Sequence, residues 1–180
     1  MVDRIHILGA SGAGTSTLAA ALSERRGYAQ IDTDQYFWEP RDPPFQRARE
    51  VGVRQRLLGE ALGAHPRWVL AGSLCGWGDI FIPRFELVIF LRLPPEIRMA
   101  RLKERERHRY GADALAPGGW RHEAYEAFIR WAEQYDTADE SIRSLRLHER
   151  WLANLACAQI RLEGALSIDE QIARLGEFVG

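Results

Sequence analysis

Hydrophobic residues follow two alternating patterns along the chain. Short apolar runs, which predict strands, alternate with longer segments in which apolar residues recur every three or four positions, as in amphipathic helices. The predicted strands span residues 4–8, 28–31, 68–71, 87–91 and 158–162. Helices are predicted near residues 16–26, 46–64, 95–109, 122–134, 139–153 and 167–178. This order predicts an α/β fold in which helices cover both faces of a doubly wound, five-stranded parallel sheet.

A glycine-rich segment joins the first predicted strand to the first predicted helix. It consists of Gly9, Ala10, Ser11, Gly12, Ala13, Gly14, Thr15, Ser16 and Thr17. Its glycines permit positive φ, so main-chain N–H groups and the positive end of the helix dipole can point at a phosphate chain. Gly9, Gly14 and Ser16 match the phosphate-loop spacing G-x-x-x-x-G-K-[ST], but Thr15 occupies the lysine position. We expect the nine residues to bind nucleotide phosphates and Ser16 to ligate Mg²⁺; the alternative is a turn without a ligand.

The composition favours a single domain spanning residues 1–180. A chain of this length can bury about 70% of the surface that it exposes when unfolded. The formal net charge of −1 gives no reason to expect binding to nucleic acid or to a membrane. The two cysteines indicate free thiols in a reducing compartment, and no apolar run reaches the length of a membrane helix. We therefore expect a soluble cytoplasmic protein that is a monomer or a homodimer.

Two aspartates follow the second predicted strand, at the sheet edge where ligands bind in folds of this kind. Asp32 and Asp34 are two residues apart, so extended backbone places both carboxylates on one face. We expect Asp32 to hold Mg²⁺ together with Ser16, and Asp34 to accept a proton from the acceptor molecule. The alternative is that one of these aspartates caps the turn that follows.

Aromatic residues and glycines lie beside these aspartates and after the third strand. Residues 72–79 hold three glycines, a tryptophan and a carboxylate, which is an unusual sequence for a simple connection. We expect Tyr36, Gly72 and Trp77 to line an acceptor pocket with Asp34, where aromatic rings, including Phe37 and Trp38, would form flat walls. The alternative is that these aromatic rings belong to the core.

Arginines recur at spacings of three and four along the helix after the fourth strand, at Arg98, Arg101, Arg105 and Arg109. This spacing places them on one side of the helix. Lys103 is the only lysine of the chain, so an arginine is the expected substitute for the missing loop cation. We expect Arg101, Arg105 and Arg109 to act catalytically on phosphates from a mobile lid. The alternative is a solvated face, because Glu104 and Glu106 interleave with the arginines.

A second series of arginines, Arg143, Arg146 and Arg150, has the same helical spacing. It predicts either a binding site for an anionic acceptor or an ordinary amphipathic helix. The five histidines show no spacing typical of a metal site or of a nucleophile–base pair, so we assign them no role.

Together these motifs resemble the P-loop nucleotide and small-metabolite kinases, which include adenylate, cytidylate and shikimate kinases. The resemblance covers the whole chain and rests on residues 9–17, 32–34, Gly72 and the arginine helix. It implies the strand order 2-3-1-4-5, a helical lid at about residues 98–120 and adenine contacts near residues 162–165. Thr15 departs from the family lysine, although similar loops occur in archaeal-type cytidylate kinases. Ala71 stands where adenylate kinases carry an aspartate, so Ser16 and Asp32 or Asp34 would hold the metal.

The resemblance implies a kinase that uses ATP and Mg²⁺ to phosphorylate a small acceptor, as nucleoside monophosphate kinases do. The acceptor would be a nucleotide, a nucleoside or a related metabolite. Two alternatives stay open. A chain that lost the loop lysine could be a nucleotide-binding sensor or regulatory module with little or no activity. A kinase for a sugar-like or polyol hydroxyl is the other, and it is favoured if Asp34 proves essential.

Overall fold

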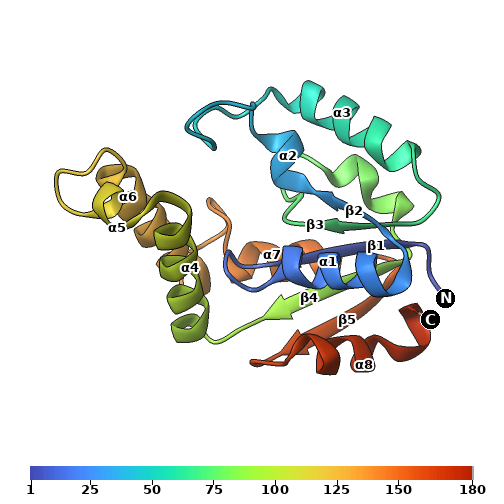
Figure 1. Ribbon diagram of the computed structural model, residues 1–180. Coiled ribbons are helices and arrows are strands. Elements are labelled where there is room, and N and C mark those ends of the chain that lie inside the picture. Colours follow the sequence, from blue (N-terminus) through green and yellow to red (C-terminus); the bar gives the residue numbers. More distant parts are fainter. Residues whose placement is uncertain (180) are drawn as a thin grey trace.

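Five parallel strands form the centre of the molecule. The computed structural model describes residues 1–179. The strands are β1 (Arg4–Gly9), β2 (Ala29–Asp32), β3 (Trp68–Ala71), β4 (Leu87–Arg92) and β5 (Ala158–Glu163). They pair in the order β2-β3-β1-β4-β5, and every pairing is parallel (Figure 1). The predicted α/β fold and the strand order 2-3-1-4-5 are therefore confirmed.

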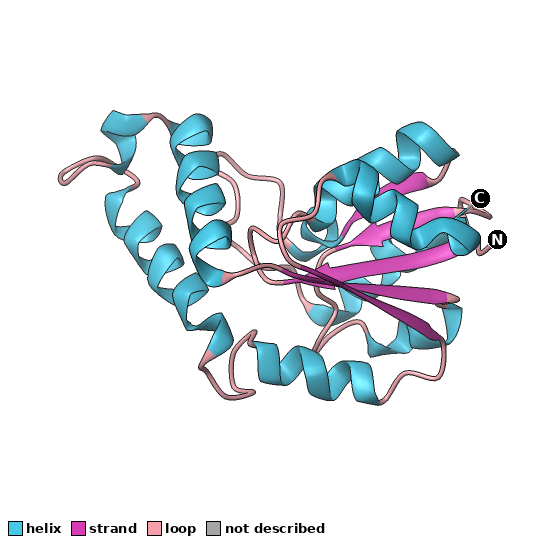
Figure 2. Ribbon diagram, turned by 90° about the horizontal axis from the view of Figure 1, so that it is seen from below, coloured by secondary structure: helices cyan, strands magenta, loops and turns pink. Residues whose placement is uncertain are grey.

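Helices cover both faces of this sheet (Figure 2). One face packs against α1 (Thr15–Arg26) and α8 (Ile168–Val179), and the other against α3 (Val51–Gly63) and α7 (Leu145–Ala153). Side chains alternate along each strand, so Ile5 and Ile7 of β1 lie on the α1 side and Leu8 on the α3 side. Two separate apolar cores result. They hold the strands in place, so that the loops after them meet at one edge.

The predicted strands end within one residue of the observed ones, but two helices begin later than predicted. Helix α3 begins at Val51 instead of residue 46, because the preceding residues pair with the segment after α2 (Thr33–Phe37). The main-chain N–H of Arg49 donates to the Phe37 oxygen at 2.8 Å, and Ala48 bridges to Trp38. Main-chain groups bonded in this way are not available to a helix. The short helices α2 and η1 (Asp79–Arg84) were not predicted.

Helix α7 begins at Leu145 instead of residue 139 because two polar side chains form a turn before it. The Asp139 carboxylate accepts a hydrogen bond from the Ser141 N–H at 2.9 Å. The Ser144 hydroxyl accepts one from the Leu147 N–H at 3.1 Å and caps the helix. Arg143 therefore lies in a loop, and the expected arginine face at residues 143–150 does not form.

A helical projection extends from the carboxyl ends of the strands, at the left of Figure 1. It comprises α4 (Pro95–Tyr110), α5 (Ala112–Leu115), α6 (His122–Glu133) and η2 (Gln134–Asp136). Met99 and Leu102 of α4 pack against Ile129 and Ala132 of α6 and form a third, small apolar core. The projection therefore extends beyond the segment 98–120 that we expected to be a lid.

Arg98 ties the base of this projection together. Its side chain is 1% exposed, forms an ion pair with Asp136 at 2.5 Å and donates to the Ala132 main-chain oxygen at 3.0 Å. The expectation that Arg98 shares the phosphate-facing side of α4 with the other arginines is thus corrected: this residue joins α4 to α6 and η2.

We expect Asp136→Asn to lower the free energy of unfolding by about 2 kcal/mol. Breaking a buried ion pair costs about 3–5 kcal/mol, and partial exposure of Asp136 reduces that cost. Urea unfolding measures the change. The control is Glu133→Gln, which removes an exposed partner of Lys103 and should cost less than about 0.5 kcal/mol. Equal costs for the two variants would contradict the assigned role of Arg98.

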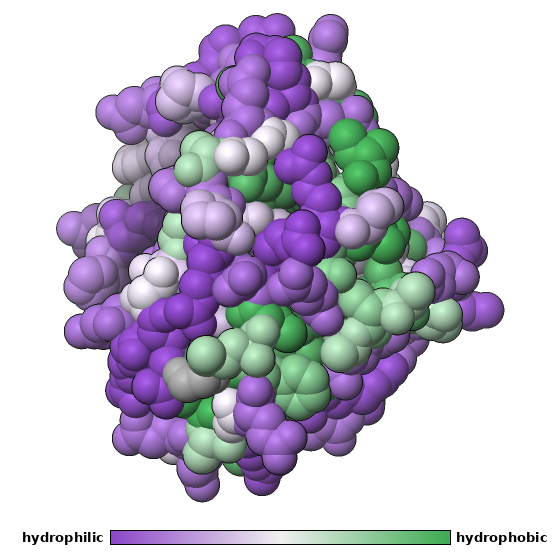
Figure 3. Space-filling model, turned by 90° about the vertical axis from the view of Figure 1, so that its right-hand side faces the viewer, coloured by the Kyte–Doolittle hydropathy of each residue, from purple (hydrophilic) through white to green (hydrophobic). Residues whose placement is uncertain are grey.

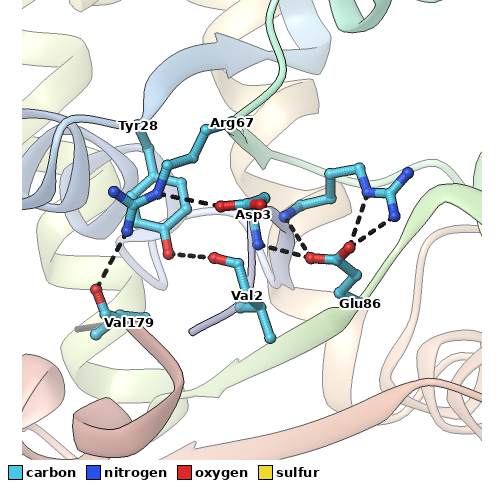
Figure 4. A network of polar contacts seen from close by, with 7 residues as sticks. Val2, Asp3, Tyr28, Arg67, Glu86 and Val179 are labelled. Carbon is cyan, nitrogen blue, oxygen red and sulfur yellow. Dashed lines mark hydrogen bonds and ion pairs between the residues drawn. The ribbon is translucent and has the colours of Figure 1, made fainter.

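The opposite end of the sheet carries both chain termini and is mainly hydrophilic, with smaller apolar areas between the polar ones (Figure 3). Figure 4 shows the polar network that ties the termini there. The Tyr28 hydroxyl donates to the Val2 oxygen at 2.6 Å, and the Glu86 carboxylate accepts from the Asp3 N–H at 2.6 Å. Arg67 lies over the Tyr28 ring at 4.0 Å. These residues, together with the contact from Arg67 to the Val179 oxygen, hold both chain termini at the end of the sheet away from the projection (Figure 4). None of the helices formed by residues 1–179 is long and apolar enough to cross a membrane.

Two histidines are buried in the core as neutral groups. His6 bonds the Leu70 oxygen at 3.1 Å and stacks on Phe85 with the ring centroids 4.9 Å apart. Burial lowers the pKa of His6 to about 4 and that of His148 to about 3. Protonation of either imidazole therefore stabilises the unfolded chain relative to the folded one.

Acid should consequently destabilise the protein before its carboxylates titrate. The contribution of each buried, neutral histidine to the free energy of unfolding is complete above pH 6.5, the pKa of a histidine in the unfolded chain. It falls as the pH drops toward the folded-state pKa, which is about 4 for His6. Between pH 7.5 and pH 5, we expect each histidine to remove about 2 kcal/mol. Urea unfolding of His6→Phe at both pH values should show roughly half of the loss seen in the parent chain. An equal loss in the variant would show that His6 is not buried in neutral form.

Candidate functional site

The loop between β1 and α1 has the geometry of a phosphate cradle. Gly12 and Gly14 have φ values of 83° and 97°, which side-chain-bearing residues rarely adopt. A Cβ atom on Gly12 would lie 2.7 Å from the Arg98 main-chain oxygen, so the close approach of α4 also requires glycine there. Helix α1 begins at Thr15, directly after the loop. The N–H groups of its first turn therefore face the loop, where they can bind phosphate oxygens.

A cavity of about 950 Å³ opens beside this loop. Its volume suits a nucleotide. It is lined by loop and α1 residues from Gly12 to Thr17, by Gln30, Asp32, Asp34 and Gln35, by Trp38, Glu39, Pro40, Arg41, Pro44 and Phe45, by Arg101, Leu102, Arg105 and Arg109, and by Leu166, Ser167, Ile168 and Gln171. Of the last four residues, Leu166 and Ser167 directly precede α8 and Ile168 and Gln171 lie in its first turn. They follow the segment 162–165 that we expected near an adenine.

Ser16 and Asp32 form the part of the cavity that fits a metal ion. The Ser16 hydroxyl donates to Asp32 Oδ2 at 2.6 Å, which places two oxygen ligands side by side. Asp32 Oδ1 also accepts from the Asp34 N–H at 2.9 Å and caps α2. The capping alternative and the metal-site expectation therefore apply to the same carboxylate. Mg²⁺ usually takes only one or two protein oxygens and completes its shell with water and phosphate, so this pair fits it. Residues 1–179 contain no cluster of three or more histidine, cysteine or acidic side chains that could hold a metal.

A second cavity, of about 780 Å³, shares a wall with the first. It is lined by Ser11, Asp34, Phe37, Trp38, Phe45, Gln46, Arg105, Glu106, Arg109, Arg121, Ala124, Phe128, Trp131 and Arg143. Asp34, Arg105 and Arg109 line both cavities. The structure thus brings one carboxylate and two cations to the junction of two ligand-sized spaces.

The surroundings of Asp34 favour its protonated form more than usual. Partial burial in the concave wall and the neighbouring Asp32 raise the pKa of the Asp34 carboxyl, although the residue stays accessible to solvent. Arg143, Arg105 and Arg109 act in the opposite direction. A carboxylate with a raised pKa is a stronger base when it is ionised, which suits proton transfer.

Three arginines of α4 face the first cavity. Arg101 lies closest to the loop: its Nη1 atom is 3.9 Å from the position that a Cβ would take on Gly14. Arg105 and Arg109 both contact Glu106, at 3.1 and 3.6 Å. The Glu106 side chain is only 4% exposed and lines the second cavity, so it does not belong to a solvated face. The sequence pattern alone did not distinguish it from Glu104.

Other predicted site residues lie elsewhere. Trp77 is 5% exposed and packs in the core on the α3 side, where its indole donates to the Ser73 oxygen. The expectation that Trp77 forms a pocket wall is therefore corrected. Tyr36 also packs against that core. Gly72 is required sterically, since a Cβ there would lie 1.9 Å from Thr33 Oγ1. Gly9 and Ala10 are buried where β1 ends, with Ala10 6% exposed, and line neither cavity.

A buried hydrogen-bonded chain links the loop after β3 to the base of the projection. His148 of α7 bonds the Ser73 hydroxyl at 3.1 Å through Nε2 and the Tyr135 hydroxyl at 2.9 Å through Nδ1. Arg98 lies 5.1 Å from the centre of the Tyr135 ring. Both His148 nitrogens are thus satisfied, which gives this histidine a structural role and fixes η2 against the sheet domain.

Comparison with known proteins identifies the family. Residues 5–128 match the model of a family described as an AAA domain. The chain belongs to this AAA-domain family. The match includes the glycine-rich loop, Asp32, Asp34 and helix α4. A protein of Bacillus subtilis (strain 168), named only as the uncharacterized protein YqaC, is 44% identical over 179 residues, which cover 99% of this AAA-domain chain and 98% of that protein.

Solved structures with a similar fold include several small-molecule kinases. A shikimate kinase from Bacteroides thetaiotaomicron has a TM-score of 0.57 at 21% identity, covering 97% of each chain. A deoxyadenosine kinase from M. mycoides with bound dATP has a TM-score of 0.52 at 16% identity, covering 96% of each chain. A gluconokinase from Sinorhizobium meliloti 1021 has a TM-score of 0.51 at 17% identity, covering 98% of this chain and 93% of that one. The AAA-domain chain therefore has the P-loop kinase fold, as the resemblance implied.

Proposed function

We propose that the protein is an ATP-dependent phosphotransferase that moves the γ-phosphoryl group to a small acceptor, which is a nucleotide, a nucleoside or a related metabolite. The observation that carries this proposal is the junction of two cavities at Asp34, Arg105 and Arg109. Six loop residues, Gly12 to Thr17, line the first cavity, whereas only Ser11 of the loop lines the second. The first cavity would therefore take ATP and the second one the acceptor. Residues 1–180 would act as one unit, with α4 to α6 as the lid.

In this proposal each group has one task. The loop amides and Ser16 bind the phosphates, and Asp32 helps Ser16 to hold Mg²⁺, which neutralises phosphate charge when bound. Asp34 takes the proton from an acceptor hydroxyl as that oxygen forms a bond to the γ-phosphorus. The bond from the γ-phosphorus to the bridging oxygen breaks at the same time, and ADP leaves. Arg101, Arg105 and Arg109 stabilise the charge that develops on the phosphate oxygens.

An acceptor screen tests the proposal. The protein is incubated with ATP, Mg²⁺ and a panel of mononucleotides, nucleosides and polyols, and ADP is measured. We expect the protein to release ADP in the presence of one class of acceptor, and the substitution Arg105→Ala to abolish that release. Arg130→Ala, at an exposed position of α6 outside both cavities, is the control and should keep the activity. A protein that does not bind ATP would refute the proposal.

Thr15 favours one alternative, a nucleotide-binding sensor or regulatory module. A threonine offers only a neutral hydroxyl where P-loop kinases have an ammonium group. Under this alternative, ATP binds but ADP release does not depend on any acceptor. The same screen therefore separates the two functions. Acceptance of polyols alone would instead identify a kinase for a sugar-like hydroxyl.

A further inference from the structure

The second cavity carries an excess of positive charge that the whole chain does not have. Four arginines line it, Arg105, Arg109, Arg121 and Arg143, against the two carboxylates Asp34 and Glu106. The formal net charge of the chain is −1, so this excess is local. It arises from three separate segments: α4, the loop before α6 and the loop before α7.

Aromatic rings hold these four guanidinium groups in place. Arg105 lies over Phe128 at 5.8 Å from the ring centre, and Arg109 over Phe45 at 5.1 Å. Arg121 lies over Tyr110 at 4.8 Å, and Arg143 over Trp131 at 5.4 Å. Stacking fixes the plane of a guanidinium but leaves its N–H edge free to donate.

Two of the four cations lack an acidic partner. Glu106 contacts Arg105 and Arg109, whereas neither Arg121 nor Arg143 forms an ion pair with any residue among 1–179. The Nε atom of Arg121 is buried without any hydrogen-bond partner in the described chain. A buried N–H group without a partner is costly, so a ligand that accepts a hydrogen bond from it would offset this cost.

Flat apolar walls stand beside this pair of arginines. Phe128 and Trp131 of α6 are stacked, with an angle of 26° between their planes. Phe37 and Trp38 also line this cavity and contact each other edge to face. Such walls match the faces of a planar ring, and polyols have no corresponding face.

We propose that Arg121 and Arg143 form an oxyanion subsite and that the second cavity binds a small molecule combining a planar ring with an attached phosphate or carboxylate. This inference rests on the proposed function, in which the second cavity takes the acceptor. It narrows the acceptor class and excludes uncharged sugars and polyols. The anion would bind to the free edges of the two guanidinium groups, with the ring between the aromatic walls.

Calorimetric titration in the presence of saturating ADP tests the subsite without requiring turnover. The probes are uridine and adenosine, their 5′-monophosphates, ribose 5-phosphate and orotate. We expect at least one ring-bearing anion to bind about tenfold more tightly than the matching nucleoside and than ribose 5-phosphate. A preferred monophosphate identifies phosphate as the anion, and preferred orotate identifies carboxylate. Binding of the nucleosides as tightly as the anions would overturn the inference.

Two variants from different loops assign the effect to the subsite. Arg121→Gln and Arg143→Gln should each reduce the preference for the anion to less than about threefold. Arg146→Gln, an exposed position that pairs with Glu140, is the matched control and should retain the preference. An unchanged preference in both subsite variants would refute the assignment. The ADP titration of the same samples is independent: ADP binding without anion preference refutes only the subsite, and absence of ADP binding refutes the proposed function.

Discussion

Arg101→Gln should lower kcat by about a thousandfold, because Arg101 is the cation best placed to replace the missing loop lysine. Its Nη1 atom lies 3.9 Å from the Cβ position of Gly14, and it forms no ion pair with residues 1–179. An arginine that stabilises the transferring phosphoryl group contributes about 10³-fold or more, which corresponds to roughly 4 kcal/mol. Steady-state rates of acceptor-dependent ADP release measure the effect. ADP affinity should change less than about tenfold, because we propose that the loop amides, and not Arg101, hold the phosphates in the ground state.

A second substitution makes this test specific. Thr15→Lys in the parent chain should raise turnover less than about tenfold if Arg101 already supplies the cation. In the Arg101→Gln background the same lysine should raise turnover by a much larger factor than in the parent chain, because it replaces the cation that the variant has lost. Arg107→Gln, at an exposed position of α4 outside both cavities, is the control and should keep the parent rate. A parent-like rate in Arg101→Gln would exclude Arg101 as the substitute.

The sheet and the first cavity could be predicted because their signals are local. The strand at residues 4–8, the glycine turn and the start of α1 follow each other directly, so sequence spacing alone positions Ser16. In the parallel sheet only β3 separates β2 from β1, and both strands end at the same edge. Asp32, at the end of β2, could therefore be expected near Ser16, which follows β1. Their 2.6 Å hydrogen bond agrees with that expectation.

The second cavity could not be predicted because distant segments build it. Arg121 and Arg143 belong to two separate loops, one before α6 and one before α7, and no periodicity connects them. One local signal was available: Asp139 and Ser144 are typical of a turn and a helix cap, so they could have placed Arg143 outside α7. The sequence also did not distinguish Arg98 from Arg101, because both fit the arginine spacing along α4. Only Arg98 is buried and paired with an acidic residue, Asp136.

Asp34→Asn should lower kcat/KM by about a hundredfold or more if Asp34 is the base that deprotonates an acceptor hydroxyl. General bases typically contribute about 10²–10⁴-fold. Asparagine keeps the size of the side chain, so ADP binding should stay close to that of the parent. Asp113→Asn, at an exposed position of α5 outside both cavities, is the control and should leave the rate unchanged.

The pH profile identifies the role of Asp34 independently of the size of the loss. Burial and Asp32 raise the pKa of this carboxyl, and a base acts only when it is ionised. In the parent chain, log kcat/KM should therefore rise with pH and level off above a pKa higher than that of an ordinary aspartate. Asp34→Asn should lack this acid limb, because the titrating group is gone. An acid limb at the same pH in the variant would assign the ionisation to another group. A nearly unchanged rate would instead indicate an acceptor oxygen that is already ionised, such as that of a phosphate, which needs no base.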